Sequence, residues 1–304
     1  MLVQSAKKLN IKTIVLDPTP NSPAGKVADK QIVGDYKDAK QIEKLARLVR
    51  FLTFEIESAN SQILIKIKKD GVRVEPPGET FEIIQDKLLQ KEFLKKNKIA
   101  VAPFAKVDSA KDITDAAKLF KYPLILKARF HGYDGRGNAN IKNEKQIKTA
   151  LNKLNSRKIY LEKYIPFKKE LATQVVRTAT GEIKVYPIVE TIQKNNICHI
   201  VIAPAIINKK IQLAASKLAK KTVAKLKGAG VFGIEMFLTK NNEVLVNEIA
   251  PRVHNSGHYT IEGAQTSQFE QHVRAVCKMP LGKVKMTAKS AVMINILGER
   301  NGKA

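Results

Sequence analysis

Two β-rich runs in the last third of the chain constrain its fold most strongly. They span residues 231–238 and 243–248, and the polar segment 239–242 separates them. Two such runs joined by a four-residue polar loop are typical of an antiparallel hairpin. The sequence therefore predicts an antiparallel sheet, and this hairpin carries two acidic residues, Glu235 and Glu248.

The spacing of these two acids predicts that they lie on one face of the hairpin. If Leu238 pairs with Glu243, then Glu235 lies opposite Val246 and diagonal to Glu248. Diagonal partners are about 7–8 Å apart at Cα, and carboxylate oxygens are ligands that hard cations prefer. A solvated strand face that carries two acids would give the same pattern. The hairpin alone leaves both interpretations open.

A polar loop follows the hairpin. Arg252, His254, Asn255 and His258 are concentrated in a segment that Pro and Gly residues interrupt. Such a segment is expected to be neither helix nor strand, so these side chains are free to line a site. Their position directly after two carboxylates favours a functional site over a surface turn.

The segment 247–282 contains the runs HNSGHYTIEG and TSQFEQH, and it resembles the signature of N5-carboxyaminoimidazole ribonucleotide synthetases, ATP-grasp enzymes of purine biosynthesis. The resemblance extends from about Leu2 to the end of the chain. It implies ATP-dependent carboxylation of 5-aminoimidazole ribonucleotide with bicarbonate, through carboxyphosphate. It also implies ATP and Mg²⁺ as cofactors, a homodimer, and a place in the cytoplasm.

The same resemblance implies an α/β and α+β architecture, in which a Rossmann-like pre-ATP-grasp domain precedes the ATP-grasp fold. We expect a partial first domain over residues 1–78, because Pro76-Pro77-Gly78 is the best linker in the chain. The ATP-grasp domain then spans residues 79–285, with a flexible lid at about 106–160, and a small C-terminal domain starts at 286–304. The family opens with a glycine-rich turn, GGGQLGRM, and Met1 aligns near its end. We therefore expect a chain truncated at both ends, or a misplaced start.

Periodicity and breaking residues predict the elements between these motifs. We expect helices over residues 2–10, 40–49, 80–96, 209–227 and 267–277, and strands over residues 11–16, 51–57, 124–127, 159–165 and 290–297.

Lys127 ends an apolar strand and precedes a glycine-rich loop over residues 128–138. Glycines allow backbone N–H groups to approach an anion, and a lysine adds a point charge, so this pair predicts a phosphate site. A glycine-rich loop alone also fits a hairpin turn. The loop resembles the family's lid loop, although His131 and Asn138 replace the usual glycine and glutamine.

The resemblance implies a set of site residues. Those implied for ATP are Lys87, Lys127, Gly132, Tyr133, Asp134, Gly135, Arg136, Gly137, Asn138, Glu162, Lys163, Tyr164, Ile165, Glu170, Gln193, Asn247 and Glu248. Those implied for the ribonucleotide and bicarbonate are Glu55, Tyr133, Asp134, Arg252, His254 and Asn255, with Glu57 as a second acid that matches the family pattern. Arg252, Asp134 and Lys127 are implied as catalytic, and Glu235 and Glu248 as the ligands of Mg²⁺. Glu170 is expected in a turn, and Gln193 stands where the family commonly has histidine.

Composition limits the other classes of function. The net charge of +26 comes from lysines spread over every segment, and only 6% of residues are aromatic, which argues against a nucleic-acid-binding protein. No apolar run approaches the ~18 residues of a membrane span, so we expect a soluble protein without a membrane partner. Cys198 and Cys277 are far apart and without metal spacing, as expected of reduced thiols.

Two alternatives remain at this point. The chain could be another ATP-grasp ligase, such as a formate-dependent glycinamide ribonucleotide transformylase. It could also be a fragment that binds ATP without turnover.

Overall fold

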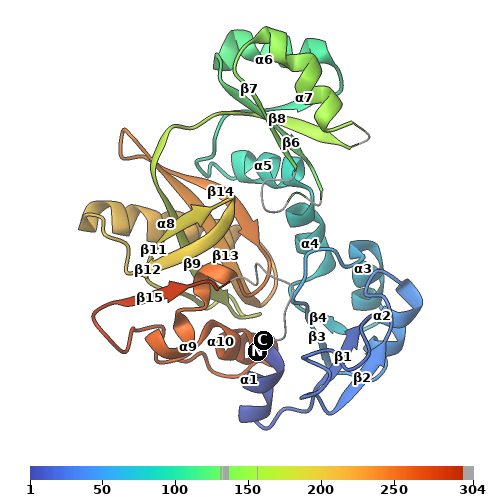
Figure 1. Ribbon diagram of the computed structural model, residues 1–304. Coiled ribbons are helices and arrows are strands. Elements are labelled where there is room, and N and C mark those ends of the chain that lie inside the picture. The colour runs from blue at the N-terminus through green and yellow to red at the C-terminus, as the bar shows by residue number, and fades with distance from the viewer. Residues whose placement is uncertain (131, 133–136, 156, 297–304) are drawn as a thin grey trace.

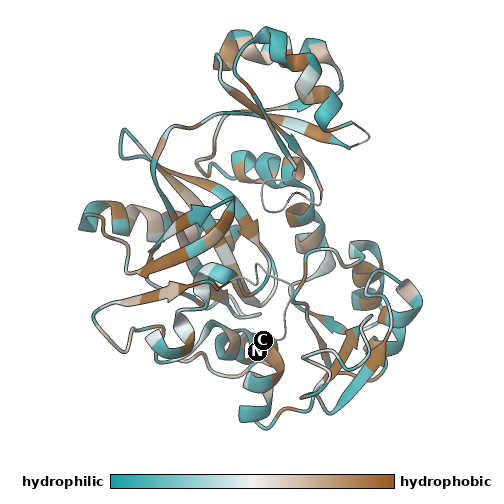
Figure 2. Cartoon of the chain, viewed as in Figure 1, coloured by the Kyte–Doolittle hydropathy of each residue, from teal (hydrophilic) through white to brown (hydrophobic). Residues whose placement is uncertain are grey.

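The computed structural model describes residues 1–130, 132, 137–155 and 157–296. Figure 1 shows an N-terminal region, a small sheet with two helices that we call the lid (residues 104–163), and a large sheet that we call the central sheet (residues 167–294). In Figure 2, apolar residues run along the strands of the central sheet. Each group of elements contributes one wall or support of the site described below.

The N-terminal region contains two pairs of parallel strands with helices beside them. Its elements are α1 (Leu2–Lys8), β1 (Ile14–Asp17), β2 (Lys30–Val33), α2 (Ala39–Ala46), β3 (Phe51–Leu52), α3 (Ser61–Lys69) and β4 (Arg73–Val74). β1 pairs with β2, and β3 pairs with β4. The helices predicted over 2–10 and 40–49 and the strand predicted over 11–16 are confirmed, with ends that differ by a few residues.

The strand predicted over residues 51–57 is wrong beyond Leu52. Its partner β4 has only two residues, and Glu75 N–H donates the last backbone hydrogen bond to Leu52 O, at 2.9 Å. Pro76 and Pro77 follow, and proline has no N–H group that could extend the ladder. Residues 53–57 therefore form a loop.

The single helix predicted over residues 80–96 is also wrong, because it is two helices. They are α4 (Gly78–Gln85) and α5 (Lys87–Lys96). Asp86 between them has an extended backbone, and its carboxylate accepts hydrogen bonds from Leu88 N at 3.0 Å and Leu89 N at 3.4 Å. This N-cap places Lys87 at the first turn of α5, where the helix meets the cavity.

The lid is an antiparallel sheet with two helices packed on it. Its elements are β5 (Phe104–Val107), α6 (Ala110–Phe120), β6 (Leu124–Ala128), β7 (Asn138–Ile141), η1 (Glu144–Gln146), α7 (Ile147–Lys153) and β8 (Ile159–Lys163). The strand order is β5-β8-β6-β7. Ile113, Leu126 and Leu161 belong to a core that the lid forms by itself. The strands predicted at 124–127 and 159–165 are confirmed, although β8 ends at Lys163.

The central sheet has the strand order β14-β13-β9-β11-β12-β15, with β10 paired to β9. Its elements are β9 (Phe167–Arg177), β10 (Ile183–Val185), β11 (Val189–Lys194), β12 (Ile197–Ala203), α8 (Lys209–Lys225), β13 (Gly230–Thr239), β14 (Val244–Ala250), η2 (Asn255–Gly257), α9 (Thr260–Gly263), α10 (Gln268–Val276) and β15 (Ala291–Ile294). The helices predicted over 209–227 and 267–277 are confirmed. Glu170, predicted in a turn, lies instead within β9, where it pairs with Thr191.

Alternation along β13 decides which side chains face the site. Successive strand residues point to opposite faces. Phe232, Ile234 and Met236 pack into the core that α8 covers, whereas Val231 belongs to a second core with α10. Glu235 lies on the same face of β13 as Val231, because the two residues are four positions apart. Its carboxylate therefore points away from α8.

The hairpin of β13 and β14 is confirmed, but its predicted register is wrong. Leu238 pairs with Val244 instead of Glu243, and Glu235 lies directly opposite Glu248 instead of Val246. The register shifts between Glu235 and Met236, which leaves Asn247 as the extra residue of a β-bulge. The register near the turn, in which Leu238 pairs with Val244, would place Glu235 opposite Asn247 if it continued, so the bulge is what brings the two carboxylates face to face.

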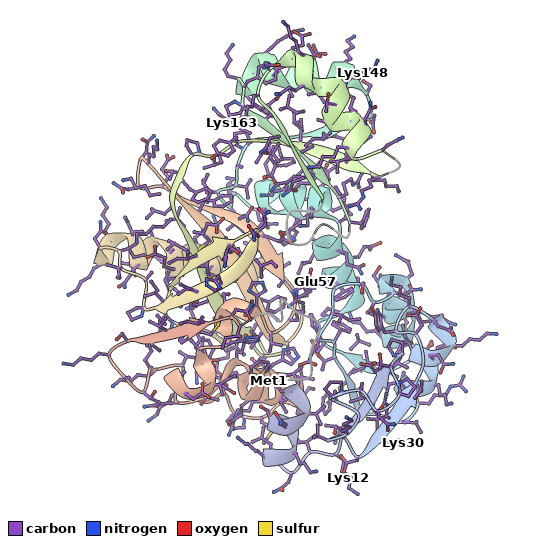
Figure 3. The ribbon with its side chains drawn as sticks, viewed as in Figure 1. Met1, Lys12, Lys30, Glu57, Lys148 and Lys163 are labelled. Carbon is purple, nitrogen blue, oxygen red and sulfur yellow. The ribbon has the colours of Figure 1, made fainter. Side chains whose placement is uncertain are left out.

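The strand predicted over residues 290–297 is confirmed as β15, which pairs with β12 and extends the central sheet. Within the described residues, no helix is long and apolar enough to cross a membrane. Lysines are exposed in different regions of the molecule, as Lys12, Lys30 and Lys148 illustrate in Figure 3. The positive charge is therefore spread over the surface.

Candidate active site

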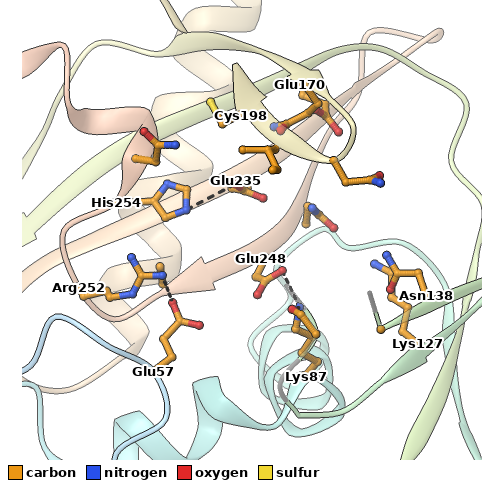
Figure 4. Close-up of a pocket in the computed structure, with 18 residues that line it drawn as sticks. Glu57, Lys87, Lys127, Asn138, Glu170, Cys198, Glu235, Glu248, Arg252 and His254 are labelled. Carbon is orange, nitrogen blue, oxygen red and sulfur yellow. Dashed lines mark hydrogen bonds and ion pairs between the residues drawn. The ribbon is translucent and has the colours of Figure 1, made fainter. Parts of the chain in front are cut away.

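A polar cavity of about 390 Å³ lies where the central sheet, the loop after β14, the start of α5 and the lid meet (Figure 4). Most of the described residues that line it were predicted from the sequence: Lys87, Lys127, Gly132, Gly137, Asn138, Glu170, Gln193, Glu235, Asn247, Glu248, Arg252, His254 and Asn255. Glu57, the second acid that matches the family pattern, also lines it, and the remaining lining residues, Asn196, Ile197, Cys198 and Ala250, were not predicted. Segments that are far apart in the sequence thus converge on one site.

Some predicted residues do not line this cavity. Glu55 is exposed in the loop over residues 53–57, and Glu162 is buried beneath the cavity. Lys163, Tyr164 and Ile165 lie at the connection between β8 and β9, outside the lining. Four further predicted residues fall outside the described part of the chain: Tyr133, Asp134, Gly135 and Arg136.

Glu235 and Glu248 have opposite electrostatic environments although they face each other. Burial and the neighbouring charges of Glu248 and Glu170 raise the pKa of Glu235 to about 7. Burial opposes ionisation of Glu248 as well, but the ammonium of Lys87, 3.0 Å from its Oε2 atom, lowers the pKa of Glu248. Among the described residues, Glu248 therefore has a lysine as its ion-pair partner, and no lysine or arginine pairs with Glu235.

Lys87 connects α5 with the lid loop and the hairpin. Its Nζ atom donates to Gly132 O at 3.0 Å and to Glu248 Oε2 at 3.0 Å. A Cβ atom at Gly137 would lie 2.9 Å from the Cα of Gly132, so the lid backbone can close this tightly here because residue 137 is glycine. The result is a narrow backbone passage beside a lysine, which suits contact with an anion.

A buried ion network lies beneath the cavity. Lys127 Nζ is 2.9 Å from Glu162 Oε2, Lys91 Nζ is 3.0 Å from Glu162 Oε1, and the Tyr160 hydroxyl donates to Glu162 Oε1 at 2.8 Å. Burial would raise the pKa of Glu162, but the two ammonium groups outweigh it and lower the pKa to about 2. The network links β6 and β8 of the lid to α5, and it fixes Lys127 at the edge of the cavity.

The sequence analysis missed Lys91. Its side chain is only 2% exposed, and it lies on the buried face of α5 with Leu88 and Leu94. The available signal was its spacing: Lys91 lies three residues from Leu88 and three from Leu94, which places it on the apolar face of the helix. A lysine on that face is buried and needs an acidic partner. That partner, Glu162, lies 71 positions further along the chain, so the sequence could not identify it.

Arg252 pairs with Glu57 across the boundary between the N-terminal region and the central sheet. Its Nη2 atom is 2.9 Å from Glu57 Oε1, as the dashed line in Figure 4 shows. Burial raises the pKa of Glu57, and Arg252 offsets this only in part. Among the described residues, the buried Nε atom of Arg252 and Oδ1 atom of Asn255 have no hydrogen-bond partner. These two atoms offer a donor and an acceptor to a ligand.

The far end of the cavity is formed by β9, β11 and β12. Burial raises the pKa of Glu170, and a hydrogen bond with Gln193 lowers it only partly. Cys198 was not predicted as a site residue, and burial raises the pKa of its thiol to about 12. This end therefore offers hydrogen-bonding groups and little reactive chemistry.

Comparisons with known proteins agree with this geometry. The ATP-grasp domain family matches residues 92–269, and the ribonucleotide synthetase preATP-grasp domain family matches residues 1–85. The chain is thus an ATP-grasp domain preceded by a preATP-grasp domain, as predicted.

Individual relatives are similar over nearly the whole chain. A phosphoribosylaminoimidazole carboxylase of Ogataea methanolica is 46% identical over 99% of this chain and 58% of that protein. An N5-carboxyaminoimidazole ribonucleotide synthase of Bacillus subtilis is 40% identical over 98% of this chain and 78% of that protein. The crystal structure of N5-carboxyaminoimidazole synthase from Aspergillus clavatus, in complex with ADP and 5-aminoimidazole ribonucleotide, has a TM-score of 0.92 at 38% identity, over 98% of this chain and 79% of that one.

The chain is shorter than these relatives. It spans 54–58% of the length of the first six curated relatives, all of them phosphoribosylaminoimidazole carboxylases.

Proposed function

Because the chain belongs to the N5-carboxyaminoimidazole ribonucleotide synthase family, we propose that it carboxylates 5-aminoimidazole ribonucleotide at the expense of ATP. The observation that carries this proposal is the convergence of two acids, two lysines and the Arg252 loop on one cavity. The related Aspergillus structure, which holds ADP and the ribonucleotide, supports the choice of ligands.

The proposed reaction has two steps. A bicarbonate oxygen attacks the γ-phosphorus of ATP, ADP leaves, and carboxyphosphate forms. In one route the exocyclic amine of the ribonucleotide attacks the carboxyl carbon of carboxyphosphate, and phosphate leaves. In the other route carboxyphosphate first breaks down to phosphate and CO₂, and the amine adds to the CO₂. In both routes the nitrogen loses a proton. Phosphoryl transfer of this kind depends mainly on positioning and on neutralisation of charge.

The nucleotide would lie along the lysine side of the cavity. Lys87 and Lys127 would neutralise phosphate oxygens, and the backbone at Gly132 and Gly137 would approach them. Glu170, together with Gln193, would bind the ribose hydroxyls. The backbone over residues 163–165 would contact adenine, and the predicted roles of Tyr133 and Asp134 stay predictions.

The carboxylate pair fits a divalent cation. Burial and the charge of Glu248 raise the pKa of Glu235 to about 7, none of the described lysines or arginines forms an ion pair with it, and a hard cation on oxygen ligands would relieve this repulsion. We propose that Glu235 and Glu248 hold Mg²⁺, which when bound supplies positive charge to the phosphate oxygens. Lys87 stays beside Glu248 and keeps that carboxylate ionised.

The anionic intermediate would lie against the loop after β14. The buried Nε atom of Arg252 offers a hydrogen bond, and its guanidinium offers positive charge, to the carboxyl and phosphoryl oxygens. His254 and Asn255 line the same end of the cavity. Glu57 holds the guanidinium in place from the N-terminal region.

The test is an ADP-release assay with Mg-ATP, bicarbonate and 5-aminoimidazole ribonucleotide, which compares the wild-type chain with Glu248→Ala. We expect release that needs both co-substrates in the wild type, and a loss of about 10²–10³-fold in the variant. Equal rates in the two proteins would contradict the metal assignment. Release with formate and glycinamide ribonucleotide instead would identify a different ATP-grasp ligase.

Binding without turnover needs a separate measurement. Mg-ATP and then the ribonucleotide should each raise the melting temperature of the wild-type chain, because ligands that bind only the folded state stabilise it. Thermal stabilisation without ADP release would mean that the chain binds its substrates and is inactive.

We also propose that the protein is a cytoplasmic homodimer. An apolar row supports a dimer: Ile192, Ile200 and Ile294 lie side by side across β11, β12 and β15, and Ile296 beyond β15 is 91% exposed. Both cysteines are free thiols, which suits a reducing compartment. Sedimentation equilibrium should give twice the chain mass of 33.8 kDa, and Ile294→Lys should give a monomer. A wild-type monomer would contradict this proposal.

A further inference from the structure

His254 is held by one nitrogen and presents the other to the cavity. Its Nδ1 atom is 2.9 Å from the hydroxyl of Ser256 and 3.4 Å from the backbone N of the same residue. Its Nε2 atom points toward Glu235 in Figure 4, at 3.7 Å from Oε1, which is beyond hydrogen-bond distance. Among the described residues, Nε2 has no hydrogen-bond partner, so it is available to a ligand.

The contacts of Nδ1 determine the tautomer. The backbone N–H of Ser256 can only donate, so its 3.4 Å contact favours a lone pair on Nδ1. The side-chain amide nitrogen of Gln174 donates to Ser256 Oγ at 2.9 Å, which leaves the hydroxyl proton of Ser256 for Nδ1. A neutral imidazole with a lone pair on Nδ1 carries its proton on Nε2. The ring therefore offers an N–H donor to the cavity.

The ring cannot turn away from this arrangement. A Cβ atom at Gly233 of β13 would lie 2.6 Å from the Cβ of His254, so the side chain lies directly on the strand. The backbone of His254 is held by Gln268, whose Oε1 accepts from His254 N at 2.9 Å and whose Nε2 donates to His254 O at 2.8 Å. Ser256, Gln174 and Gln268 are all buried, which isolates the arrangement from solvent.

The charges around the ring keep it neutral. Burial and the positive charge of Arg252 lower the pKa of His254 to about 4, although Glu248 acts in the opposite direction. Glu235 faces Nε2 from β13, and His258 faces the ring from the same loop. In the tautomer set by Ser256, the nitrogen that faces the cavity carries the proton, so it can donate a hydrogen bond and has no lone pair with which to accept a proton from a substrate.

We propose that Ser256 and Gln174 are positioning residues that fix His254 in the tautomer with its proton on Nε2, so that Nε2–H is directed at a carboxyl or phosphoryl oxygen in the cavity. This inference rests on the proposed function for the identity of that oxygen. It assigns His254 to stabilisation of the anion and excludes it as the base that removes a proton from the amine. Second-sphere residues that orient an imidazole typically change activity by about 10–100-fold when they are removed.

The first test is ¹⁵N NMR of the full chain labelled at histidine, in the absence of substrates. The chain has five histidines, and His254→Gln identifies the resonances of interest. We expect an unprotonated Nδ1 and a protonated Nε2 in the wild type. Ser256→Ala removes the 2.9 Å hydroxyl contact and leaves only the longer 3.4 Å contact from the backbone N–H, so it should increase the share of the other tautomer. A protonated Nδ1 in the wild type would overturn the proposal, and this result does not depend on any enzymatic activity.

The second test is kinetic. Ser256→Ala should lower kcat/KM for bicarbonate about tenfold and leave the KM for ATP unchanged, because only the anion contacts His254. Thr173→Val is the matched control, since it removes a buried hydroxyl beside Gln174 that donates to Tyr186 O at 2.8 Å and does not contact His254. The control should change neither the tautomer nor kcat/KM. Wild-type kinetics for Ser256→Ala, or an equal loss in both variants, would contradict the proposed role.

Discussion

Glu162 in the lid is a buried carboxylate, Glu235 in the central sheet is a partly buried one, and the charges around them differ. Glu162 is 3% exposed and has two lysines within 3.0 Å, which hold its pKa at about 2. Glu235 is 32% exposed toward the cavity, lies opposite another carboxylate, and has a pKa near 7. Among the described residues, two lysines compensate the charge of Glu162, and no lysine or arginine pairs with Glu235.

This difference separates a structural ion network from a binding site. A buried charge without a partner destabilises the folded state, so proteins rarely retain one without a function. Lys91 and Lys127 complete the buried ion network, and each of them already contacts one carboxylate oxygen of Glu162. Glu235 has room for a cation and an electrostatic need for one, which is why we assign the metal to it.

The largest effect on stability is expected from neutralising Glu162, whose charge two lysines compensate. Glu162→Gln would leave Lys91 buried beside a neutral amide, and removal of one partner from a buried ion pair typically costs about 3–5 kcal/mol. Urea titration should show this loss in the free energy of unfolding. A lid that unfolds separately would appear as a second transition.

An exposed ion pair provides the matched control for this substitution. Glu43 is 2.9 Å from Lys66 on the surface of the N-terminal region. Glu43→Gln should leave the unfolding transition almost unchanged, because solvent screens exposed pairs. If Glu162→Gln were equally harmless, the network would not be structural, and the contrast with Glu235 would fail.

The next largest effect is expected from neutralising Glu235, the acid that faces Glu248, and it concerns turnover. Glu235→Gln should reduce turnover with Mg-ATP by about 10²–10³-fold, since it removes one of two proposed ligands of the cation. The rate at saturating substrates measures this loss. Titration with Mg²⁺ should show a weaker metal requirement in the variant. Retention of wild-type turnover would place the cation elsewhere.

The smallest effect is the pH dependence of stability. The folded-state pKa of Glu235 is raised, so its contribution to stability is lost as pH rises from about 4.5 to about 7. Glu162 has a lowered pKa, and its contribution is lost as pH falls from about 4.5 to about 2.

Without divalent cations, Glu235→Gln should therefore exceed the wild type in unfolding free energy by about 1–2 kcal/mol at pH 8, after allowance for partial exposure, and match it at pH 4. Urea titrations at the two pH values measure this. Addition of Mg-ATP at pH 8 should remove the advantage of the variant. A constant difference at all pH values would mean that Glu235 does not titrate in this range.

Much of the fold could be predicted because its signals are local. Apolar periodicity predicted α8 and α10, and the two β-rich runs predicted the hairpin. Errors occurred where a distant partner decided the outcome. The two-residue strand β4 ended β3 at Leu52 in this way. The division of the helix predicted over 80–96 has a local cause, because Asp86 is an N-cap that the sequence analysis did not recognise.

The candidate site shows the same limit. The acids of the hairpin and the loop with Arg252 and His254 were found from sequence and resemblance. Glu57 rather than Glu55 lines the cavity, because the loop after β3 turns only one of them toward Arg252. Lys91 gave only a weak signal, since its partner lies on a strand of another region.

The sequence by itself determined the family of the protein, the hairpin with its two acids, and most residues of the cavity, because these are set by runs of neighbouring residues. Only the tertiary structure decided the register that places Glu235 opposite Glu248, and which buried carboxylate receives a lysine. The physical reason is that the electric potential at a carboxylate depends on charges a few ångströms away in space. For Glu162 those charges are Lys91 and Lys127, and both come from elements that the chain reaches long before β8.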